Sequence, residues 1–227
     1  MKAPDKMLRV RLLTGLVSFV ITIFLSGHQA WQVEDIVWSV WLASLVTSVT
    51  LIFVALVFAP LSKKATKRVI LDRISTAYGN LSARRQMVFS VGISCLAAII
   101  VSVSIIWLHG IQATLISLFF GVEGAGVGGV SQVPFRAVVM SYWEFTLLAL
   151  LFNVPLYAMF ILGKREADIT LPFVFLMYNF FIIVGIIFVS AVAPEIGAMY
   201  LALVAYFFPF EIMADRLKAR RARRLER

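Results

Sequence analysis

Glu144 is the side chain in this sequence whose chemistry most needs an explanation. It follows Tyr142 and Trp143 in an apolar run, about two turns inside a stretch long enough to cross a bilayer. A carboxylate at that depth costs several kcal/mol unless it is paired, hydrated or protonated. Glu144 therefore either carries a proton or binds a cation in an internal cavity, or it joins two helices as a protonated or hydrogen-bonded group.

Arg136 directly precedes the same apolar stretch, eight residues before Glu144. The two residues lie on roughly the same helix face but about two turns apart, so direct pairing would require both side chains to extend along the helix. Glu123 and Glu195 are equally good candidate partners for Arg136.

Asn153 and Asn179 form a pair of amides on consecutive apolar stretches. A short connection, from Gly163 to Thr170, joins these stretches and makes them antiparallel neighbours. Each asparagine lies about nine residues from that connection, so their depths match. We expect a hydrogen bond between the two side chains, worth roughly 0.6–2 kcal/mol, and rank a polar ligand site second.

His28 and His109 both lie at predicted outer helix ends, near Glu34, Asp35 and Glu123. Histidines and carboxylates together can bind a metal ion. The spacing of these residues matches no compact metal motif, however, and HExxH is absent from the sequence. We therefore expect interfacial polar side chains here, with no metal and no other cofactor.

Glu211 and Asp215 lie four residues apart on one helix face, at the inner end of the last apolar stretch. Arg216, Lys218 and Arg220 follow them directly. We interpret these residues as a solvated ion-pair network at the membrane edge. A cytoplasmic proton-entry site is the alternative.

The sequence motifs of common enzymes are absent. There is no Ser-His-Asp arrangement, GxSxG, paired CxxC or phosphate-binding loop. The single cysteine, Cys95, excludes an intrachain disulfide and lies in an apolar run, as a small packing residue would. Only Glu144 and distant histidines remain as reactive groups, so we do not expect an enzyme.

The composition identifies the elements that must position these side chains. The chain is 61% hydrophobic and 15% charged, whereas globular domains are about 45–50% apolar and about 25% charged. Six apolar runs approach the roughly 20 residues of a membrane-spanning helix. They cover residues 10–27, 36–59, 87–109, 137–162, 171–192 and 196–213. The sequence therefore predicts an all-α transmembrane bundle that forms a single domain over residues 1–227.

The basic residues indicate the orientation of these spans. Twenty of the 21 lysines and arginines fall at the N-terminus, in the connections 61–86 and 163–170, and in the tail 214–227, while Arg136 alone lies on the other side. Cytoplasmic loops of membrane proteins carry this excess. We expect both termini to be cytoplasmic in a bacterial inner membrane.

Aromatic and small residues mark the ends and faces of these helices. Three tryptophans flank the start of the second span and one the end of the third, which predicts side chains at headgroup depth. They are Trp31, Trp38, Trp41 and Trp107. Small residues repeat along two spans, which predicts helix-packing seams rather than a pore lining. The seams are Ser90, Ser94, Ala98 and Ser102, and Ser44, Thr47 and Ser48.

Two connections carry predictions of their own. Residues 61–86 have the pattern of an amphipathic helix on the inner leaflet, where anionic lipid attracts their basic side chains, as it attracts those of the tail 214–227. Charge alone does not indicate nucleic acid. Residues 111–122 are apolar but too short to span and precede a glycine-rich stretch. They form either a re-entrant half-helix or, as we prefer, an interfacial helix before a surface loop.

Three pieces of the sequence form a recognisable pattern. They are Trp41 shortly after Asp35, the pair His109 and Gly110, and the closing stretch 208–224 with Asp215. The pattern resembles that of a bacterial family of multi-pass membrane proteins of unknown function. This chain lacks the acidic residue that the family carries directly after Trp41. The resemblance implies the topology and no particular activity.

Three classes of function remain after these observations. The first is a carrier or channel for a small solute or ion that uses Glu144 as its coupling or selectivity group. The second is a non-catalytic subunit or scaffold, either a homo-oligomer or one that assembles with partner membrane proteins. The third, ranked last, is a membrane-embedded enzyme acting on lipid or peptide.

Overall fold

The computed structural model describes residues 3–58, 83–120, 135–162, 171–190, 192 and 195–208. All regular structure in these ranges is helical. The elements are α1 (Ala3–His28), α2 (Val33–Phe53) continued by the π-helical η1 (Val54–Phe58), α5 (Ala83–Phe120), α6 (Phe135–Ile161), α7 (Leu171–Ser190) and α8 (Glu195–Tyr206). The predicted all-helical fold class is therefore confirmed.

Five of these helices are long and apolar enough to cross a membrane. The candidate spans are Arg9–His28, Val33–Val57, Val91–Phe119, Arg136–Ile161 and Leu171–Ser190. The sixth predicted span, 196–213, is described only as far as residue 208, where it contains α8. The connection 61–86 up to residue 82, the glycine-rich stretch, residues 163–170 and the tail with Glu211 and Asp215 lie outside the described residues.

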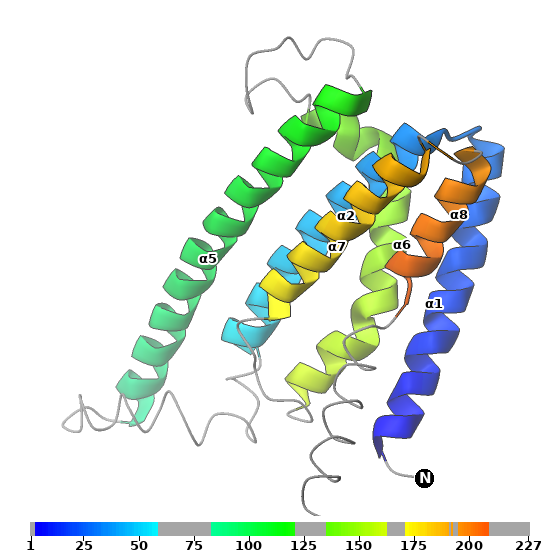
Figure 1. The fold of residues 1–227 in the computed structure, drawn as a ribbon. Coiled ribbons are helices and arrows are strands. Elements are labelled where there is room, and N and C mark those ends of the chain that lie inside the picture. Colours follow the sequence, from blue (N-terminus) through cyan, green and yellow to red (C-terminus); the bar gives the residue numbers. More distant parts are fainter. Residues whose placement is uncertain are drawn as a thin grey trace, which may run out of the picture.

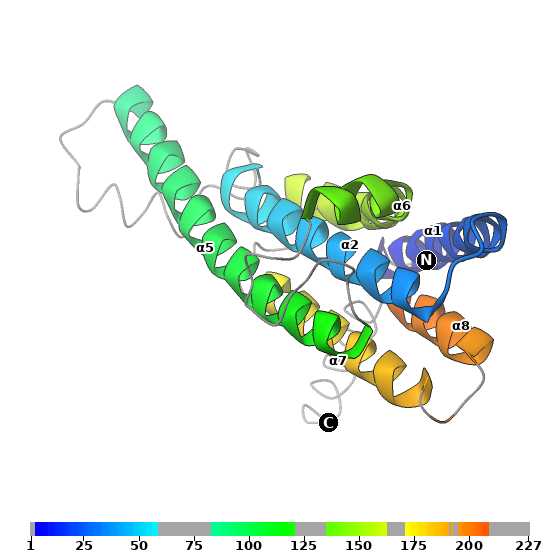
Figure 2. The ribbon, with the colours of Figure 1, turned by 90° about the horizontal axis from the view of Figure 1, so that it is seen from above.

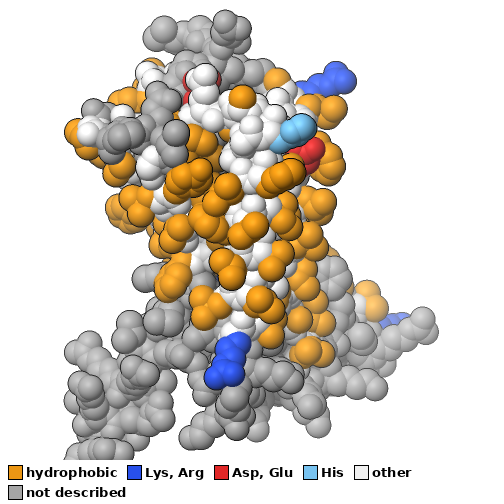
Figure 3. Space-filling model, turned by 90° about the vertical axis from the view of Figure 1, so that its right-hand side faces the viewer, with side chains coloured by type: hydrophobic (Ala, Val, Ile, Leu, Met, Phe, Trp, Pro, Cys, Tyr) orange, Lys and Arg blue, Asp and Glu red, His pale blue; other side chains and the backbone are white. Residues whose placement is uncertain are grey.

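Helix α2 forms the centre of the bundle. It packs against α5, α6, α7 and α8, and α1 packs against α6 on the far side (Figures 1 and 2). Most of its residues are buried, because it is apolar on every face. Its small serine and threonine side chains also let the neighbouring helices approach closely. The outer surface is apolar as well. Hydrophobic side chains cover the middle of the face shown in Figure 3, and charged side chains lie near its two ends.

The small residues of α2 and α5 lie in the packed interior. Ser94, Ala98 and Ser102 are buried on α5, which packs on α2, and Ser44, Thr47 and Ser48 are fully buried on α2. Small side chains let neighbouring helices approach closely. The structure thus buries these residues between helices, as the predicted seams require, except for Ser90, whose side chain lies outside the described part.

Residues 111–120 are neither re-entrant nor a separate interfacial helix. They continue α5, which runs unbroken for 38 residues from Ala83 to Phe120. The predicted third span ended at residue 109, but Gly110 does not end the helix, because a glycine inside one costs only about 1 kcal/mol relative to alanine. The burial of Gln112, Ala113 and Ile116 after it offsets that cost.

Two of the four tryptophans face the interior of the bundle rather than its surroundings. Trp38 and Trp41 are buried between helices, with their ring centroids 5.6 Å apart. Trp107 is exposed on α5 and fits the prediction by its exposure. The position near a span end was read correctly for Trp38 and Trp41, but the helix face was not, because every face of α2 is apolar.

Gly15 allows α1 to approach the end of α8 closely. A Cβ at this position would lie 2.6 Å from the backbone oxygen of Phe207 and 3.1 Å from the ring of Phe152. Gly27 on the same helix has nothing within 4 Å of such a Cβ. The two glycines therefore form a matched pair for testing this contact.

We expect Gly15→Ala to lower the free energy of unfolding by about 1–3 kcal/mol, because the backbone contact must open to admit the methyl group. Gly27→Ala should leave it unchanged or raise it by up to about 1 kcal/mol, since alanine is the better helix former. Denaturant titration of both variants in the same mild detergent measures the difference. Equal effects of the two substitutions would contradict the close approach.

Candidate functional site

Arg11 is fully buried inside the bundle, which the sequence did not predict. Its Nη1 donates to Asn153 Oδ1 at 2.9 Å and to the backbone oxygen of Phe152 at 3.3 Å. Its guanidinium carbon lies 4.1 Å from the centroid of the Phe152 ring, a cation–π contact. We had counted Arg11 among the basic residues of the cytoplasmic N-terminus. Instead, α1 and α6 hold its charge between them.

The predicted hydrogen bond between Asn153 and Asn179 is wrong. Asn153 accepts from Arg11 and donates its Nδ2 to Ala149 O at 2.8 Å. Asn179 is buried, and within the described residues neither polar atom of its side chain has a hydrogen-bond partner. A charged donor forms a stronger bond than a second neutral amide, so Asn153 pairs with the guanidinium.

Three hydroxyl groups lie beside this pair. Thr47 is close to both Tyr157 and Tyr206, and Arg11 is near enough to both tyrosines to influence them electrostatically. Each of the three side chains is at least nine-tenths buried. The Thr47 hydroxyl lies within hydrogen-bonding range of both tyrosine hydroxyls, but none of the three forms a well-aligned hydrogen bond to another described residue. They therefore form a cluster of incompletely satisfied polar groups near a buried cation.

Ser48 and Asn179 lie at the same level of the bundle. Leu51, Val54 and Phe175 belong to one hydrophobic cluster, and α2 and α7 run in opposite directions (Figure 1). Thr47 and Ser48 lie about one turn before Leu51 on α2, and Asn179 lies about one turn after Phe175 on α7. Because the two helices are antiparallel, Asn179 lies at the same level of the bundle as Thr47 and Ser48. We call the combined set the polar layer: Arg11, Thr47, Ser48, Asn153, Tyr157, Asn179 and Tyr206.

Hydroxyls elsewhere in the helices are satisfied locally. Nine described serines and threonines donate to a carbonyl of the preceding turn, at 2.8–3.2 Å. They are Thr14, Thr22, Ser26, Thr50, Ser104, Thr114, Ser117, Thr146 and Ser190. Outside the polar layer, only Ser39 and Ser102 are buried and unsatisfied among the described hydroxyls. The unsatisfied groups are thus concentrated in one place.

Glu144 lies at the other end of the bundle from Arg11, beside the turn between α1 and α2. Its Oε2 accepts from Gln29 Nε2 at 2.8 Å, and Gln29 Oε1 accepts from Trp31 Nε1 at 2.7 Å. The carboxylate is half-buried and Gln29 is exposed. The structure thus places Glu144 at a different end of the bundle from Arg11 and Asn153.

The same end contains a second carboxylate contact, which defines an outer cluster. Tyr142 donates its hydroxyl to Asp35 Oδ1 at 2.7 Å, and Asp35 Oδ2 accepts from the backbone nitrogen of Gln32 at 2.7 Å. Tyr142 also has non-helical backbone angles, so α6 is kinked there. The outer cluster consists of Gln29, Trp31, Asp35, Tyr142 and Glu144, and it joins the α1–α2 turn to the kink.

His109 is buried and fully engaged by its neighbours. Its Nδ1 lies 3.0 Å from Ile105 O and its Nε2 3.2 Å from Ser44 Oγ. The carbonyl requires a proton on Nδ1, so Nε2 accepts from the serine. Trp41 donates to the His109 backbone oxygen at 2.9 Å. This histidine therefore joins α2 to α5.

The remaining candidates do not come together. His28 and Arg136 are exposed, and the side chain of Glu195 lies outside the described part. In the ranges that the structure covers, no three histidine, cysteine or carboxylate side chains form a group that could hold a metal.

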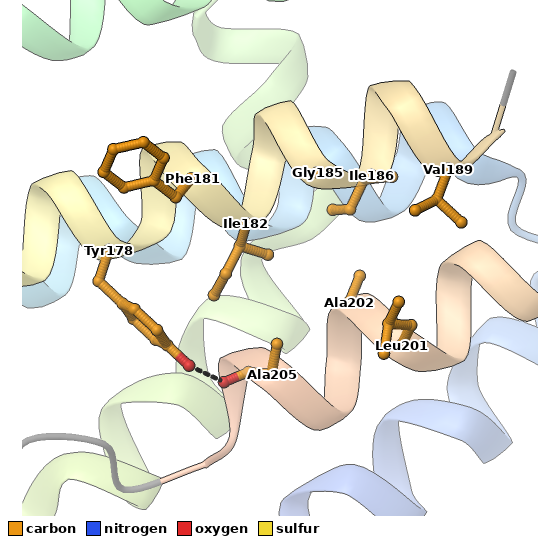
Figure 4. Close-up of a pocket in the computed structure, with 9 residues that line it drawn as sticks. All are labelled: Tyr178, Phe181, Ile182, Gly185, Ile186, Val189, Leu201, Ala202 and Ala205. Atoms are coloured by element: carbon orange, nitrogen blue, oxygen red, sulfur yellow. Dashed lines mark hydrogen bonds between the residues drawn. The ribbon is translucent and has the colours of Figure 1, made fainter.

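An apolar groove with a volume of about 270 Å³ lies between α7 and α8. Gly185, Ala202 and Ala205 leave it hollow, and Tyr178 at its end donates to Ala205 O at 2.7 Å (Figure 4). Ligand sites combine an apolar lining with several convergent polar groups. This groove lacks such groups, so the polar layer is the stronger candidate site.

Comparison of the chain with family models, with curated proteins and with solved structures finds no match in any of the three. The function is therefore inferred from the geometry of this chain alone.

Proposed function

We propose that this chain is a multi-pass inner-membrane protein with both ends in the cytoplasm, and that it carries or conducts a small polar solute through the polar layer. The five apolar helices and the one-sided distribution of basic residues support the membrane location and the orientation. The polar layer supports the transport class.

The observation that carries the proposal is the set of unsatisfied polar atoms around Thr47. A buried hydroxyl or amide without a partner costs about 1–3 kcal/mol. Bilayer lipid offers no hydrogen bonds, so this cost is not relieved from outside the bundle. Helices α2, α6, α7 and α8 all contribute such atoms. Water or a solute entering the layer would satisfy them, whereas a bundle built only for packing gains nothing from them.

Glu144 has a different role in this proposal from the one its sequence position suggested. It lies with Asp35 and Tyr142 at the α1–α2 end, where a half-buried carboxylate meets an exposed glutamine. We assign it to the entrance on that side, where it would attract or repel ions before they reach the layer.

The alternative is a scaffold that assembles with partner membrane proteins. It is favoured by α5, which packs mainly on α2 and leaves Leu96, Ile100 and Val103 more than half exposed. Lipid or a partner helix would cover that face equally well. The scaffold has no need of a wet interior, and this difference separates the two proposals.

The test is the reactivity of cysteines placed in the interior. In a Cys95→Ala background, we expect Thr47→Cys to react with membrane-impermeant methanethiosulfonate reagents, cationic or anionic, added to sealed vesicles. Ala98→Cys, equally buried in the α2–α5 seam, should stay unreactive. Protection of the Thr47→Cys variant from both faces of the membrane would mean a dry interior and would favour the scaffold.

A further inference from the structure

We infer that the kink of α6 at Tyr142 is a conformational switch: the turn between α1 and α2 holds the helix bent through Asp35, and α6 straightens when that bond is released. The switch lies in the outer cluster and works in the same way whether the interior of the bundle is wet or dry, so it is independent of the proposed function. Three observations support it: the lack of a local cause for the kink, the contacts that grip it, and the sparse packing of the segment before it.

The kink has no cause in the residues of α6 that ordinarily bend a helix. Tyr142 has a φ of −123° and a ψ of 18°, which are not helical angles. Sharp kinks usually arise at proline or glycine. Helix α6 contains no glycine, and its one proline, Pro155, lies in its second half. A proline disturbs the turn directly before it, so Pro155 does not bend the helix at Tyr142.

The hydroxyl of Thr146 is the remaining local candidate, because it donates to Tyr142 O at 3.1 Å. A threonine that bonds back to the preceding turn can bend a helix. Thr22 in α1 and Thr114 in α5 make the same bond, at 2.8 and 3.0 Å, and both helices continue through these residues. A bond of this kind is therefore not sufficient to produce the kink.

The contacts that grip α6 at the kink come from the turn between α1 and α2. Tyr142 donates its hydroxyl to Asp35 Oδ1 at 2.7 Å. The ring of Trp31 lies edge-on to the ring of Tyr142, with a centroid distance of 6.1 Å. Two residues later, Glu144 Oε2 accepts from Gln29 Nε2 at 2.8 Å. A tertiary contact thus acts on the one residue of α6 whose angles are not helical.

The turn is held firmly enough to impose this bend. Ala30 has a φ of 50°, the left-handed conformation that ends many helices, and Trp31 N donates to Ser26 O at 2.9 Å, which closes the end of α1. Asp35 Oδ2 accepts from Gln32 N at 2.7 Å, which fixes the start of α2. The position of Asp35 is therefore set by α2, and Tyr142 has to meet it.

The segment of α6 before the kink is packed sparsely. Among residues 136–141 only Val138 is buried, and Met140 and Ser141 are exposed, whereas Phe145 just after the kink is fully buried. Straightening would therefore reorient this segment with little loss of packing, and it would restore regular helical bonding at Tyr142. The bond to Asp35 that opposes straightening is only partly buried. The bent and straight forms thus differ by few interactions, as the two states of a switch must.

The experiment is solid-state NMR of the full chain in lipid bilayers, with its six tyrosines labelled with ¹³C. The chemical shift of a Cα atom reports the backbone angles of its own residue. In the unmodified protein, we expect the Cα signal of Tyr142 to lie outside the helical range and those of Tyr157 and Tyr178 to lie within it. Tyr142→Phe removes one signal from the spectrum and so assigns it.

Two substitutions of Asp35 release the kink. Asp35→Ala should move the Tyr142 signal into the helical range, because the acceptor that holds the bend is gone. Asp35→Asn should move it in the same direction by less, since a neutral amide is a weaker acceptor than a carboxylate. Glu34→Ala removes the adjacent carboxylate and should leave the signal in place, as should Thr146→Val. Unchanged Tyr157 and Tyr178 signals show in the same spectrum that each variant is folded.

Two results would overturn the inference. If the Tyr142 signal stays outside the helical range in both Asp35 variants while the Tyr157 and Tyr178 signals are unchanged, the kink is intrinsic to α6. If Thr146→Val alone moves the Tyr142 signal into the helical range, the bond to the preceding turn causes the kink. Neither result affects the labelling of Thr47→Cys, so the switch and the proposed function fail separately.

Discussion

Asn153→Leu is expected to lower the free energy of unfolding by about 2–4 kcal/mol. The substitution keeps the volume of the side chain roughly constant but removes the oxygen that accepts from Arg11 Nη1 at 2.9 Å. The guanidinium is fully buried, so solvent cannot replace this acceptor. Loss of one partner of a buried charge is costly because the desolvated charge remains. Denaturant titration in mild detergent measures the change.

Asn179→Leu is the matched control for this prediction. It makes the same chemical change at a similar level of the bundle, but no described residue hydrogen-bonds the Asn179 side chain. Its removal should be neutral or stabilising, because an unsatisfied amide is lost. If the two asparagines had paired with each other, as their spacing suggested, both substitutions would destabilise equally. Equal losses would therefore contradict the Arg11–Asn153 contact.

Combining Arg11→Met with Asn153→Leu should restore part of the lost stability. Replacement of a whole buried polar pair by apolar side chains of similar volume is often neutral or better. The double variant thus separates the cost of stranding the charge from any general damage to the α1–α6 contact. A double variant less stable than Asn153→Leu alone would show that Arg11 is needed for packing through its stem and its contact with Phe152.

The helical architecture was predictable because it depends on length and polarity alone. A run of about 20 apolar residues must be helical in lipid whatever its neighbours are. The small residues of α2 and α5 were predictable for a similar reason, since small side chains between long apolar ones indicate close packing. Both inferences require only the local sequence.

The buried charge was missed because the positive-inside rule assigns basic residues by their place in the chain. Arg11 lies at the start of an apolar run, where arginine is ordinarily solvated. A signal was nevertheless present on the helix face. Gly15, Ser18, Thr22 and Ser26 follow Arg11 at intervals of three and four, and the structure buries Ser18, Thr22 and Ser26 on that face. An arginine that begins a stripe of small residues shares the buried face of its helix.

Glu144 shows a different limit of sequence reasoning, because a count of residues from a span edge gives a position along the helix but not the partner of the side chain. The candidate span Arg136–Ile161 keeps Glu144 about two turns from its start. Here α6 is kinked at Tyr142, and the α1–α2 turn lies beside the kink. The partner of Glu144, Gln29, is 115 residues away in sequence. No local pattern contains this contact, so only the tertiary structure reveals it.

Asp35→Ala should lower the free energy of unfolding by about 2–4 kcal/mol, because the carboxylate makes two bonds to different elements. One oxygen accepts from Gln32 N and caps α2, and the other accepts the hydroxyl of Tyr142 at the kink in α6. Loss of a cap costs about 0.5–2 kcal/mol, and loss of a charged hydrogen bond about 1.5–3 kcal/mol. Thermal unfolding in detergent, followed by tryptophan fluorescence, measures the total and also reports on Trp31, whose ring packs on Tyr142 with a centroid distance of 6.1 Å.

Glu34→Ala is the control for this change. Glu34 is the adjacent carboxylate in the same first turn of α2, so it contributes equally to the helix dipole, but Asp35 forms the cap and the bond to Tyr142. Removal of the Glu34 carboxylate should lower the free energy of unfolding by less than about 1 kcal/mol. The loss for Tyr142→Phe should fall between those for Glu34→Ala and Asp35→Ala, since it removes one of the two bonds of Asp35. A series in which Glu34→Ala matches Asp35→Ala would mean that negative charge near the helix start, rather than the contact between α2 and the α6 kink, stabilises this end of the bundle.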